Sequence, residues 1–238
     1  MRRYLRHQRR LWHPALTALD EGGPPATEDD AREEQLEEKV SLRDQRLGTV
    51  ESILTASKAR RVLDLGCGPG ALLTRLVKSG YDEVVGVDVS IRSLEIAHKR
   101  LKLDELSDER RAKIKLLHSP LTYRDKRLKG YDAAVLVEVI EHFDPPRLQA
   151  ATHNVFAEAR PTTVIVTTPN AEYNVRWESL PAGQLRHPDH RFEWTRTQFA
   201  AWARHTGDSH GYEVRFLPIG PEDPEVGAPT QAAVFQLR

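Results

Sequence analysis

The sequence predicts an α/β fold in which a mostly parallel sheet carries helices on both faces. From residue 60 onward, short apolar runs alternate with amphipathic stretches, an order typical of strand–helix–strand units. A glycine-rich turn at 66–70 follows the first of these runs, and acidic residues end two later ones. Because ligands bind at the carboxyl ends of strands in open α/β sheets, the functional site is expected there.

The composition indicates one soluble, globular domain with a short appendage. The 238 residues suit a single domain, and no apolar run approaches the roughly 20 residues of a membrane helix. The apolar residues of the basic N-terminus are too scattered for a signal peptide. Thirty-five basic residues balance 35 acidic ones, so nucleic-acid binding would need a local patch. A single cysteine, Cys67, cannot form an internal disulfide, which favours a cytoplasmic location.

Residues 1–40 are expected to form a charged segment or linker ahead of a domain that spans 41–238. The first 13 residues hold five arginines and no acid, whereas 20–38 hold nine acids and one arginine. Glycines and prolines at 22–25 separate the two charge types. Solvated tails and the trailing edge of a neighbouring domain are both compatible with this pattern. Apolar residues at helical spacing then predict a helix over 33–54.

The remaining elements follow from their local patterns. Runs rich in valine, leucine and isoleucine, bounded by turn residues, predict strands at 61–65, 82–90, 113–118, 131–139, 162–168, 212–220 and 230–237. Amphipathic stretches predict helices at 71–80, 91–103, 145–159 and 195–207, of which the third has proline in its first turn. The polar, aromatic-rich stretch 170–194 has no regular period, and loops of this kind often carry function.

The turn at 66–70 is expected to bind a cofactor. The run from Val62 to Gly70 reads V-L-D-L-G-C-G-P-G and places a strand, a glycine turn and a helix start in succession. Glycine lets a ligand approach the backbone, and the helix N-terminus offers free N–H groups. Asp64 precedes the first glycine, and Asp88 ends the next strand, 18 residues beyond Gly70. An acid at that second position can accept hydrogen bonds from both hydroxyls of an adenosine ribose.

The D-L-G-C-G-P-G run with its following G-V-D resembles motif I of S-adenosylmethionine-dependent methyltransferases. Nicotinamide-binding enzymes usually lack the acid two residues before the first glycine. The resemblance implies a Rossmann-like class I methyltransferase fold with a seven-stranded, mostly parallel sheet. It also implies that the cofactor is bound by Asp64, Gly66, Gly68, Gly70, Ala71, Asp88 and Ser119.

Three potential metal ligands follow the fourth expected strand. Glu138, Glu141 and His142 fall at positions i, i+3 and i+4, so one helical turn would place them on one face. Two carboxylates and an imidazole suit Mg²⁺ or Mn²⁺. A solvated helix face is the alternative, but the place at the carboxyl end of a central strand favours a site. His187 and His190 in the 170–194 stretch are both candidates for a fourth ligand.

Three motifs together resemble the HEN family of RNA 3′-terminal ribose 2′-O-methyltransferases: E-V-I-E-H, T-T-P-N-x-E-Y-N and R-H-x-D-H-R-F-E-W-T-R. The resemblance covers about residues 40–238 and is strongest to the catalytic half of the bacterial members. It implies that Glu138, Glu141, His142 and His190 are the catalytic metal ligands, with His187 in support. Departures are Arg43 in a leading L-R-D-Q-R, where asparagine is frequent, and His118 before Ser119, where glycine is commoner.

The same resemblance implies a function. S-adenosylmethionine and Mg²⁺ or Mn²⁺ would be the cofactors, and RNA with a free 2′,3′-diol at its 3′ end the substrate, in RNA repair or small-RNA end protection. A polynucleotide kinase–phosphatase–ligase would be a partner. Arginines interleaved with aromatics predict RNA contacts by Arg186, His187, Arg191 and Arg196, although Phe192 and Trp194 fit the core of the next helix equally well.

Two rival functions stay open. One is a metal-dependent methyltransferase of small-molecule diols such as catechols, against which the arginine-rich insert argues. The other is a non-catalytic, cofactor-binding subunit that scaffolds RNA repair. The presence of Asp64, Asp88 and all four candidate ligands argues against a loss of activity.

Overall fold

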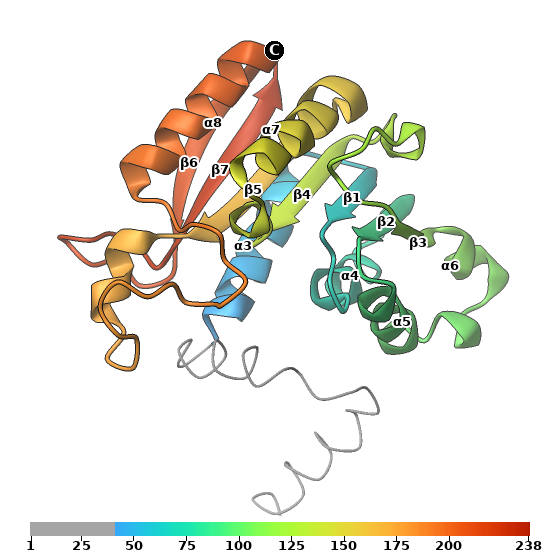
Figure 1. The fold of residues 1–238 in the computed structure, drawn as a ribbon. Helices are drawn as coiled ribbons and strands as arrows, with labels where there is room; N and C mark the ends of the chain where they lie inside the picture. The colour runs from blue at the N-terminus through green and yellow to red at the C-terminus, as the bar shows by residue number, and fades with distance from the viewer. Residues whose placement is uncertain (1–40) are drawn as a thin grey trace, which may run out of the picture.

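Seven strands form one sheet in the computed structural model, which describes residues 41–238 (Figure 1). The strand order is β3-β2-β1-β4-β5-β7-β6. Strands β1 to β5 run parallel, and β7 pairs antiparallel with β5 and β6, so the mostly parallel seven-stranded sheet is confirmed. The bounds are β1 Arg61–Leu65, β2 Glu83–Asp88, β3 Ile114–His118, β4 Ala133–Val137, β5 Thr163–Pro169, β6 Tyr212–Ile219 and β7 Thr230–Leu237.

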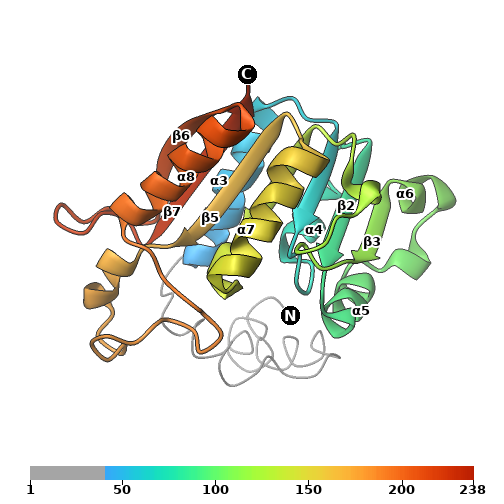
Figure 2. The same cartoon turned by 45° about the horizontal axis from the view of Figure 1, so that its top comes forward.

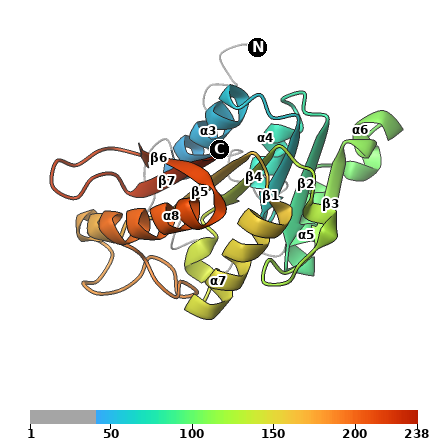
Figure 3. The same ribbon diagram turned by 90° about the horizontal axis from the view of Figure 1, so that it is seen from above.

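Helices cover both faces of this sheet. Figure 3 shows α3 and α4 on one side and α7 and α8 on the other. The α-helices are α3 Leu42–Ala56, α4 Ala71–Leu76, α5 Ile91–Arg100, α6 Asp108–Ala112, α7 Pro145–His153 and α8 Arg196–His210. Short 3-10 turns lie at η1 Leu103–Glu105, η2 Lys126–Leu128, η3 Ile140–His142 and η5 Ala171–Arg176, and a π-turn, η4, at Asn154–Ala159. Among residues 41–238, no helix has the length and apolar character needed to cross a membrane.

Two hydrophobic clusters, one on each face, form the core. One contains side chains of α3, α4 and α5, and the other contains side chains of α7, η4 and α8. Strand β5 lies between them and is buried along its whole length. Burial on both faces explains why the central strands are continuously apolar rather than alternating. Polar residues of these strands include Thr167 and Thr168 at the carboxyl end of β5, which are 0% exposed and adjoin the site described below.

The helices differ from the sequence-based expectations in several places. Helix α3 begins at Leu42 after its N-cap Ser41, α4 ends at Leu76 rather than at 80, α5 ends at Arg100 rather than at 103, and α6 was not expected. The helix expected over 145–159 changes at Asn154 from α-helix into the π-turn η4. Helix α8 runs on to His210 instead of ending at Gly207, because Gly211 with its φ of 79° caps it. Gly207 serves close packing: a Cβ atom there would come within 2.5 Å of the Val214 Cγ2 atom. The expected charged segment 1–40 lies outside the described residues.

Candidate active site

The turn between β1 and α4 is shaped by three glycines with left-handed backbone. Gly66, Gly68 and Gly70 have φ angles of 77°, 51° and 80°, and Ala71 then begins α4. Gly66 lies against Val139 beyond β4, since a Cβ atom there would come within 2.6 Å of the Val139 Cγ2 atom. A Cβ atom at Gly68 would meet nothing within 4 Å. The turn therefore presents bare backbone to open space, as a ligand-binding turn requires.

Asp88 and Asp64 lie beside this turn at the carboxyl ends of neighbouring strands. The Asp88 carboxylate accepts hydrogen bonds from the backbone N–H groups of Gly68 (2.8 Å) and Ser90 (2.7 Å). Asp64 is 2% exposed, and its Oδ2 atom has no hydrogen-bond partner among residues 41–238. Burial, and then the Asp88 charge, raises the pKa of Asp64 to about 7. An unsatisfied buried carboxylate of this kind suits a cationic group of a ligand.

Ser119 follows β3 and adjoins Asp88 through its backbone. Its N–H group donates to the Asp88 carbonyl oxygen over 3.1 Å, while its hydroxyl donates to Asp125 over 2.7 Å. Arg127 donates to the same Asp125 carboxylate and holds the pKa of that carboxyl well below its usual range. The Ser119 hydroxyl is thus engaged by a neighbour that sequence reasoning did not single out.

Glu138 and Glu141 do not share one helical turn. Glu138 has a left-handed φ of 53°, and the 3-10 turn begins only at Ile140. The expectation of a single turn over 138–142 is therefore wrong. The cause is a pair of contacts with strand β5. The Glu138 N–H group donates to the Thr167 carbonyl oxygen, and the Glu138 carboxylate accepts from the Thr167 hydroxyl over 2.8 Å. These bonds to β5 hold Glu138 outside the turn.

The two carboxylates nevertheless influence one another. Glu141 is 0% exposed, accepts from the Thr168 hydroxyl over 3.1 Å, and has an Oε1 atom without a hydrogen-bond partner in the described part of the chain. Burial, and then the Glu138 charge, raises the pKa of Glu141 well above its ordinary value. The buried Arg46 of α3 places its Nε atom 3.5 Å from the Glu138 Oε1 atom. Buried, incompletely satisfied carboxylates of this kind suit a bound cation.

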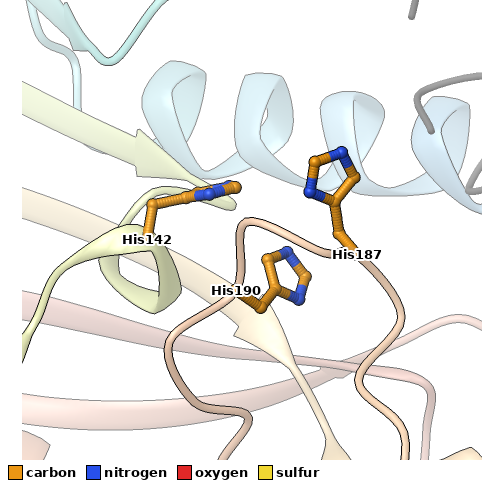
Figure 4. Close-up of side chains that lie close together, drawn as sticks. All are labelled: His142, His187 and His190. Carbon is orange, nitrogen blue, oxygen red and sulfur yellow. The ribbon is translucent and has the colours of Figure 1, made fainter. Parts of the chain in front are cut away.

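Three imidazole rings converge at the turn that follows β4 (Figure 4). His142 comes from this turn and His187 and His190 from the loop before α8, and one ring nitrogen of each lies within 4.8 Å of the others. The Arg191 N–H group donates to the Glu141 carbonyl oxygen over 2.8 Å, which holds the loop on the turn. Desolvation, and then His190 and His187, lowers the pKa of His142 to about 4. The ring is therefore neutral at pH 7, the form that binds metals.

A buried polar network that sequence reasoning missed holds this loop. Glu193 contacts the His190 Nδ1 atom and accepts from the Arg186 backbone N–H group, both over 2.7 Å. Its other oxygen accepts from Asn174. Burial alone would raise the pKa of Glu193, but these hydrogen bonds outweigh it and lower the pKa. The R-H-x-D-H-R-F-E-W run contained this acid, yet nothing in its spacing showed that it would be buried.

Strand β7 fixes the two ends of the loop segment together. The Gln231 side-chain amide donates to the carbonyl oxygens of Pro169 (3.0 Å) and Trp194 (2.9 Å), one at each end of the segment 170–194. Figure 2 shows this segment, in orange, extending beyond the sheet beside the start of α7. The histidines of the loop are thus carried by a segment anchored at its base.

Arg186, expected to contact RNA, is 6% exposed. Its Nε atom donates to the Asn174 side chain over 2.7 Å and its Nη2 atom to the Asn170 carbonyl oxygen over 2.8 Å. Its guanidinium also lies 5.6 Å from the Trp177 ring centroid. These contacts stabilise the loop, so any contribution to RNA binding would be made from a largely buried position.

Two other expected RNA contacts are accessible. Arg191 lies at the surface with its Nε atom 3.8 Å from Asp144, and Arg196 pairs with Glu172 over 2.5 Å. The Arg191 and Arg196 side chains are 54% and 49% exposed, which leaves room for a phosphate. His187 lies in the histidine cluster. RNA contact stays a prediction for all four residues.

The aromatic residues after His190 pack on the fold. The Phe192 and Trp194 rings stack with centroids 4.2 Å apart, and both pack against the core beside Trp202. They also line a groove between α7 and α8. Phe192 and Trp194 therefore pack as core residues, which is one of the two interpretations of the sequence, and they also border the groove.

Comparisons with known proteins agree with this geometry. Residues 6–207 match the family model described as a methyltransferase domain. The small RNA 2′-O-methyltransferase of Mus musculus is 36% identical over 205 residues, which cover 83% of this chain and 51% of that protein. The chain thus spans about half the length of several curated relatives that it matches.

Solved structures give the same picture. The crystal structure of the methyltransferase domain of bacterial CtHen1-CN is 52% identical, covers 83% of this chain and 100% of that one, and has a TM-score of 0.76. A chain in the structure of the Pnkp1/Rnl/Hen1 RNA repair complex shares the fold, with a TM-score of 0.62 at 22% identity over 82% of this chain and 42% of that one.

Proposed function

Because this chain belongs to the HEN family of methyltransferase domains, we propose that it methylates the 2′-oxygen of the 3′-terminal ribose of RNA. S-adenosylmethionine is the methyl donor and a divalent metal ion, Mg²⁺ or Mn²⁺, the second cofactor. The observation that carries the proposal is the contact of Gly66 with Val139. It joins the cofactor turn directly to the segment that holds Glu138, Glu141 and His142. We place the start of the catalytic domain at residue 41, before α3.

The residues beside the glycine turn fit S-adenosylmethionine. When bound, this cofactor supplies an electrophilic methyl group on a sulfonium. The Asp88 carboxylate would accept hydrogen bonds from the ribose hydroxyls, as acids at this position do. The unpartnered Oδ2 atom of Asp64 would receive the ammonium group of the methionine part. Gly68 would let the cofactor approach the backbone, and Ser119 would lie near the adenine edge.

Among residues 41–238, the ligand atoms that lie within 4.8 Å of one another are those of His142, His187 and His190, and the carboxylates of Glu138 and Glu141 lie outside this group. The Glu141 Oε1 atom is buried without a partner among residues 41–238, and three imidazoles stand beside the turn that carries it. Glu138, Glu141, His142 and His190 would hold the ion, which when bound would lower the pKa of a ribose hydroxyl. The carboxylates suit Mg²⁺ or Mn²⁺, and the proposed set contains no thiolate of the kind that structural zinc sites use.

Hydrogen bonds favour His190 over His187 as the fourth ligand. A neutral imidazole has one lone pair. The His187 Nδ1 atom accepts from the Asp189 N–H group over 3.1 Å, so its lone pair is already used. The His190 Nδ1 atom lies 2.7 Å from the Glu193 carboxylate, to which it donates, and this leaves its Nε2 lone pair free. His187 would instead lie near a phosphate or hydroxyl oxygen of the RNA.

A methyl-transfer assay tests the proposal. The protein is given radiolabelled S-adenosylmethionine, Mn²⁺ and one RNA sequence that ends in a 2′,3′-diol, a 3′-phosphate or a 2′-deoxyribose. Label should enter only the diol RNA, and nuclease digestion should release it as a 3′-terminal 2′-O-methylnucleoside. Label at internal positions, or equal label with the 3′-phosphate, would overturn the proposal. A catechol in place of RNA tests the small-molecule alternative, and no transfer to any acceptor would favour the non-catalytic one.

We further propose a cytoplasmic protein that works with a polynucleotide kinase–phosphatase–ligase. The support for the partner is a chain of this fold in a complex named for Pnkp1, Rnl and Hen1. The support for the cytoplasm is the single cysteine of the chain. Co-purification of a tagged full-length protein from its own cells, with the ligase identified by mass spectrometry, tests the partnership. Recovery of the protein without any such enzyme would argue against it.

A further inference from the structure

We infer that Glu193 is a positioning residue that determines which ring nitrogen of His190 is available to the metal. The inference rests on the proposed function, in which His190 is a ligand. It concerns a residue that touches neither the methyl donor nor the reacting oxygen. Glu193 instead acts through the His190 ring. It contacts the Nδ1 atom, and the Nε2 atom on the other side of the ring would bind the metal.

The two side chains form a sealed pair. The His190 side chain is 2% exposed and the Glu193 side chain 0%, and the His190 Nδ1 and Glu193 Oε1 atoms are 2.7 Å apart. Water therefore has little access to either group, and the ring has no alternative partner at Nδ1 in the described loop. A histidine that binds a metal through one nitrogen commonly donates from the other to a carboxylate, which sets its tautomer and its orientation.

The other partners of Glu193 show that it acts as an acceptor. Its Oε1 atom also accepts from the Arg186 backbone N–H group over 2.7 Å. Its Oε2 atom accepts from the Asn174 amide nitrogen, whose assignment follows because the Asn174 Oδ1 atom accepts from Arg186 Nε. Both carboxylate oxygens thus face N–H donors, so the His190 Nδ1 atom meets an acceptor and donates to it. The Nε2 atom is then the ring nitrogen that would face the metal.

The same contacts fix where the ring lies. Arg186 reaches from the loop to the Asn170 carbonyl oxygen over 2.8 Å, and Asn170 follows β5 directly. Through Arg186, Glu193 therefore links His190 to Asn170, the first residue after β5. His187 lacks such a tie at Nδ1, where its partner is the N–H group of Asp189 two residues away. This difference accounts for two neighbouring histidines having separate roles.

Glu193→Gln is the sharpest variant because the amide cannot satisfy all three donors. If its oxygen faces His190 and Arg186, its NH₂ group opposes the Asn174 NH₂ group. If it is flipped, its NH₂ group opposes the Arg186 N–H group and drives His190 to the other tautomer. Glu193→Asp keeps the charge and is the conservative rescue. Glu172→Gln is the matched control, because Glu172 is an acid in η5 of the same segment and its partner is Arg196.

Two measurements test the inference. Nitrogen-15 NMR of histidine rings in the metal-free protein should show His190 protonated on Nδ1 in the wild type and in Glu172→Gln, and a mixture of tautomers in Glu193→Gln. Calorimetric titration with Mn²⁺ should show affinity reduced about 10- to 100-fold in Glu193→Gln, partly restored in Glu193→Asp and unchanged in Glu172→Gln. Titration with S-adenosylmethionine, which uses the other end of the site, should give wild-type affinity and shows that each variant is folded.

The outcomes separate this inference from the proposed function. A wild-type His190 tautomer together with wild-type Mn²⁺ affinity in Glu193→Gln would overturn the positioning role. If the wild-type protein binds no Mn²⁺, the metal site of the proposed function is wrong. The NMR comparison needs no metal, so it would still show whether Glu193 sets the tautomer of His190. Should Glu193→Gln fail to bind S-adenosylmethionine, Glu193→Asp supplies the same two readouts in a charge-conserving background. There, a mixture of His190 tautomers together with wild-type Mn²⁺ affinity would count against the inference, because the tautomer would then not decide metal binding.

Discussion

Val139 and Gly66 touch so closely that Gly66 has no room for a side chain: a Cβ atom would come within 2.6 Å of the Val139 Cγ2 atom. The first residue belongs to the segment of candidate metal ligands and the second to the cofactor turn. The two halves of the proposed site are therefore in van der Waals contact through the backbone of one and the side chain of the other. A change at this contact should disturb both halves.

Gly66→Ala should destabilise the protein and weaken cofactor binding. The left-handed φ of 77° at Gly66 costs an alanine roughly 1–2 kcal/mol, and the contact with Val139 adds overpacking of about 1–3 kcal/mol. Urea unfolding and calorimetry measure the two effects. Gly183→Ala is the control, because its φ is 79° but no atom lies within 4 Å of the added Cβ. Adding Val139→Ala should restore part of the Gly66→Ala loss, and equal losses at both glycines would contradict the packing argument.

Asp88→Ala should weaken S-adenosylmethionine binding at least tenfold without unfolding the protein. Hydrogen bonds to a charged carboxylate contribute about 1.5–3 kcal/mol each, and the Asp88 side chain also positions the Gly68 N–H group. Calorimetric titration gives the affinity, with circular dichroism as the check on folding. Asp82→Ala is a suitable control, since its carboxylate pairs with Arg60 at the opposite end of the strand. Unchanged affinity in Asp88→Ala would remove this residue from the site.

Asp64 should make stability depend on pH. Its pKa in the folded protein is about 7, above the ordinary value near 3.8, so the folded state binds more protons than the unfolded state between these values. The free energy of unfolding should therefore decrease as pH rises from about 4 to 7, by at most about 1.4 kcal/mol per pH unit. Asp64→Asn should flatten this slope in urea titrations at several pH values and weaken cofactor binding. If Asp64→Asn shows the same dependence of unfolding free energy on pH as the wild type, another group causes that dependence.

His190→Ala and His187→Ala should differ in metal binding. Loss of His190 removes a proposed ligand, so Mn²⁺ affinity and methyl transfer should fall while S-adenosylmethionine binding persists. Loss of His187 should leave Mn²⁺ affinity largely intact, because its Nδ1 lone pair is engaged by Asp189. Excess Mn²⁺ should partly rescue His190→Ala by mass action. If His190→Ala keeps full activity at limiting metal and His187→Ala loses activity, His187 and not His190 is the fourth metal ligand.

The sheet was predictable because its cues are local. Apolar runs bounded by turn residues located all seven strands, and the glycine turn lies between β1 and α4 as its sequence predicted. The same reasoning failed at Glu138, where bonds to Thr167 of β5 override the helical spacing of the acids. Thr167 is 29 residues away in the chain, and no periodicity carries such information.

The sequence showed which residue types the histidine-bearing loop contains, but it did not show which of its charged residues are buried. The concentration of histidines in 185–195 indicated a site, and the structure brings His187 and His190 to His142. Arg186 and Glu193 were harder, because charged residues in a loop are usually solvated, whereas here both are buried. Gly207 could not be interpreted from the sequence for a similar reason. A glycine within a helical pattern can mark the end of the helix or make room for a neighbouring strand. The contact with Val214 of β6 shows that Gly207 does the second.

The place of β7 in the sheet has a consequence for how the site is assembled. This strand follows β6 in the chain but lies between β5 and β6, and its Gln231 fastens both ends of the histidine-bearing loop. During synthesis the loop emerges about 40 residues before the side chain that latches it. The geometry of the loop therefore depends on a strand that contributes no candidate ligand. A change that removes the Gln231 amide should loosen the base of this loop while the cofactor turn, which lies between β1 and α4, keeps its shape.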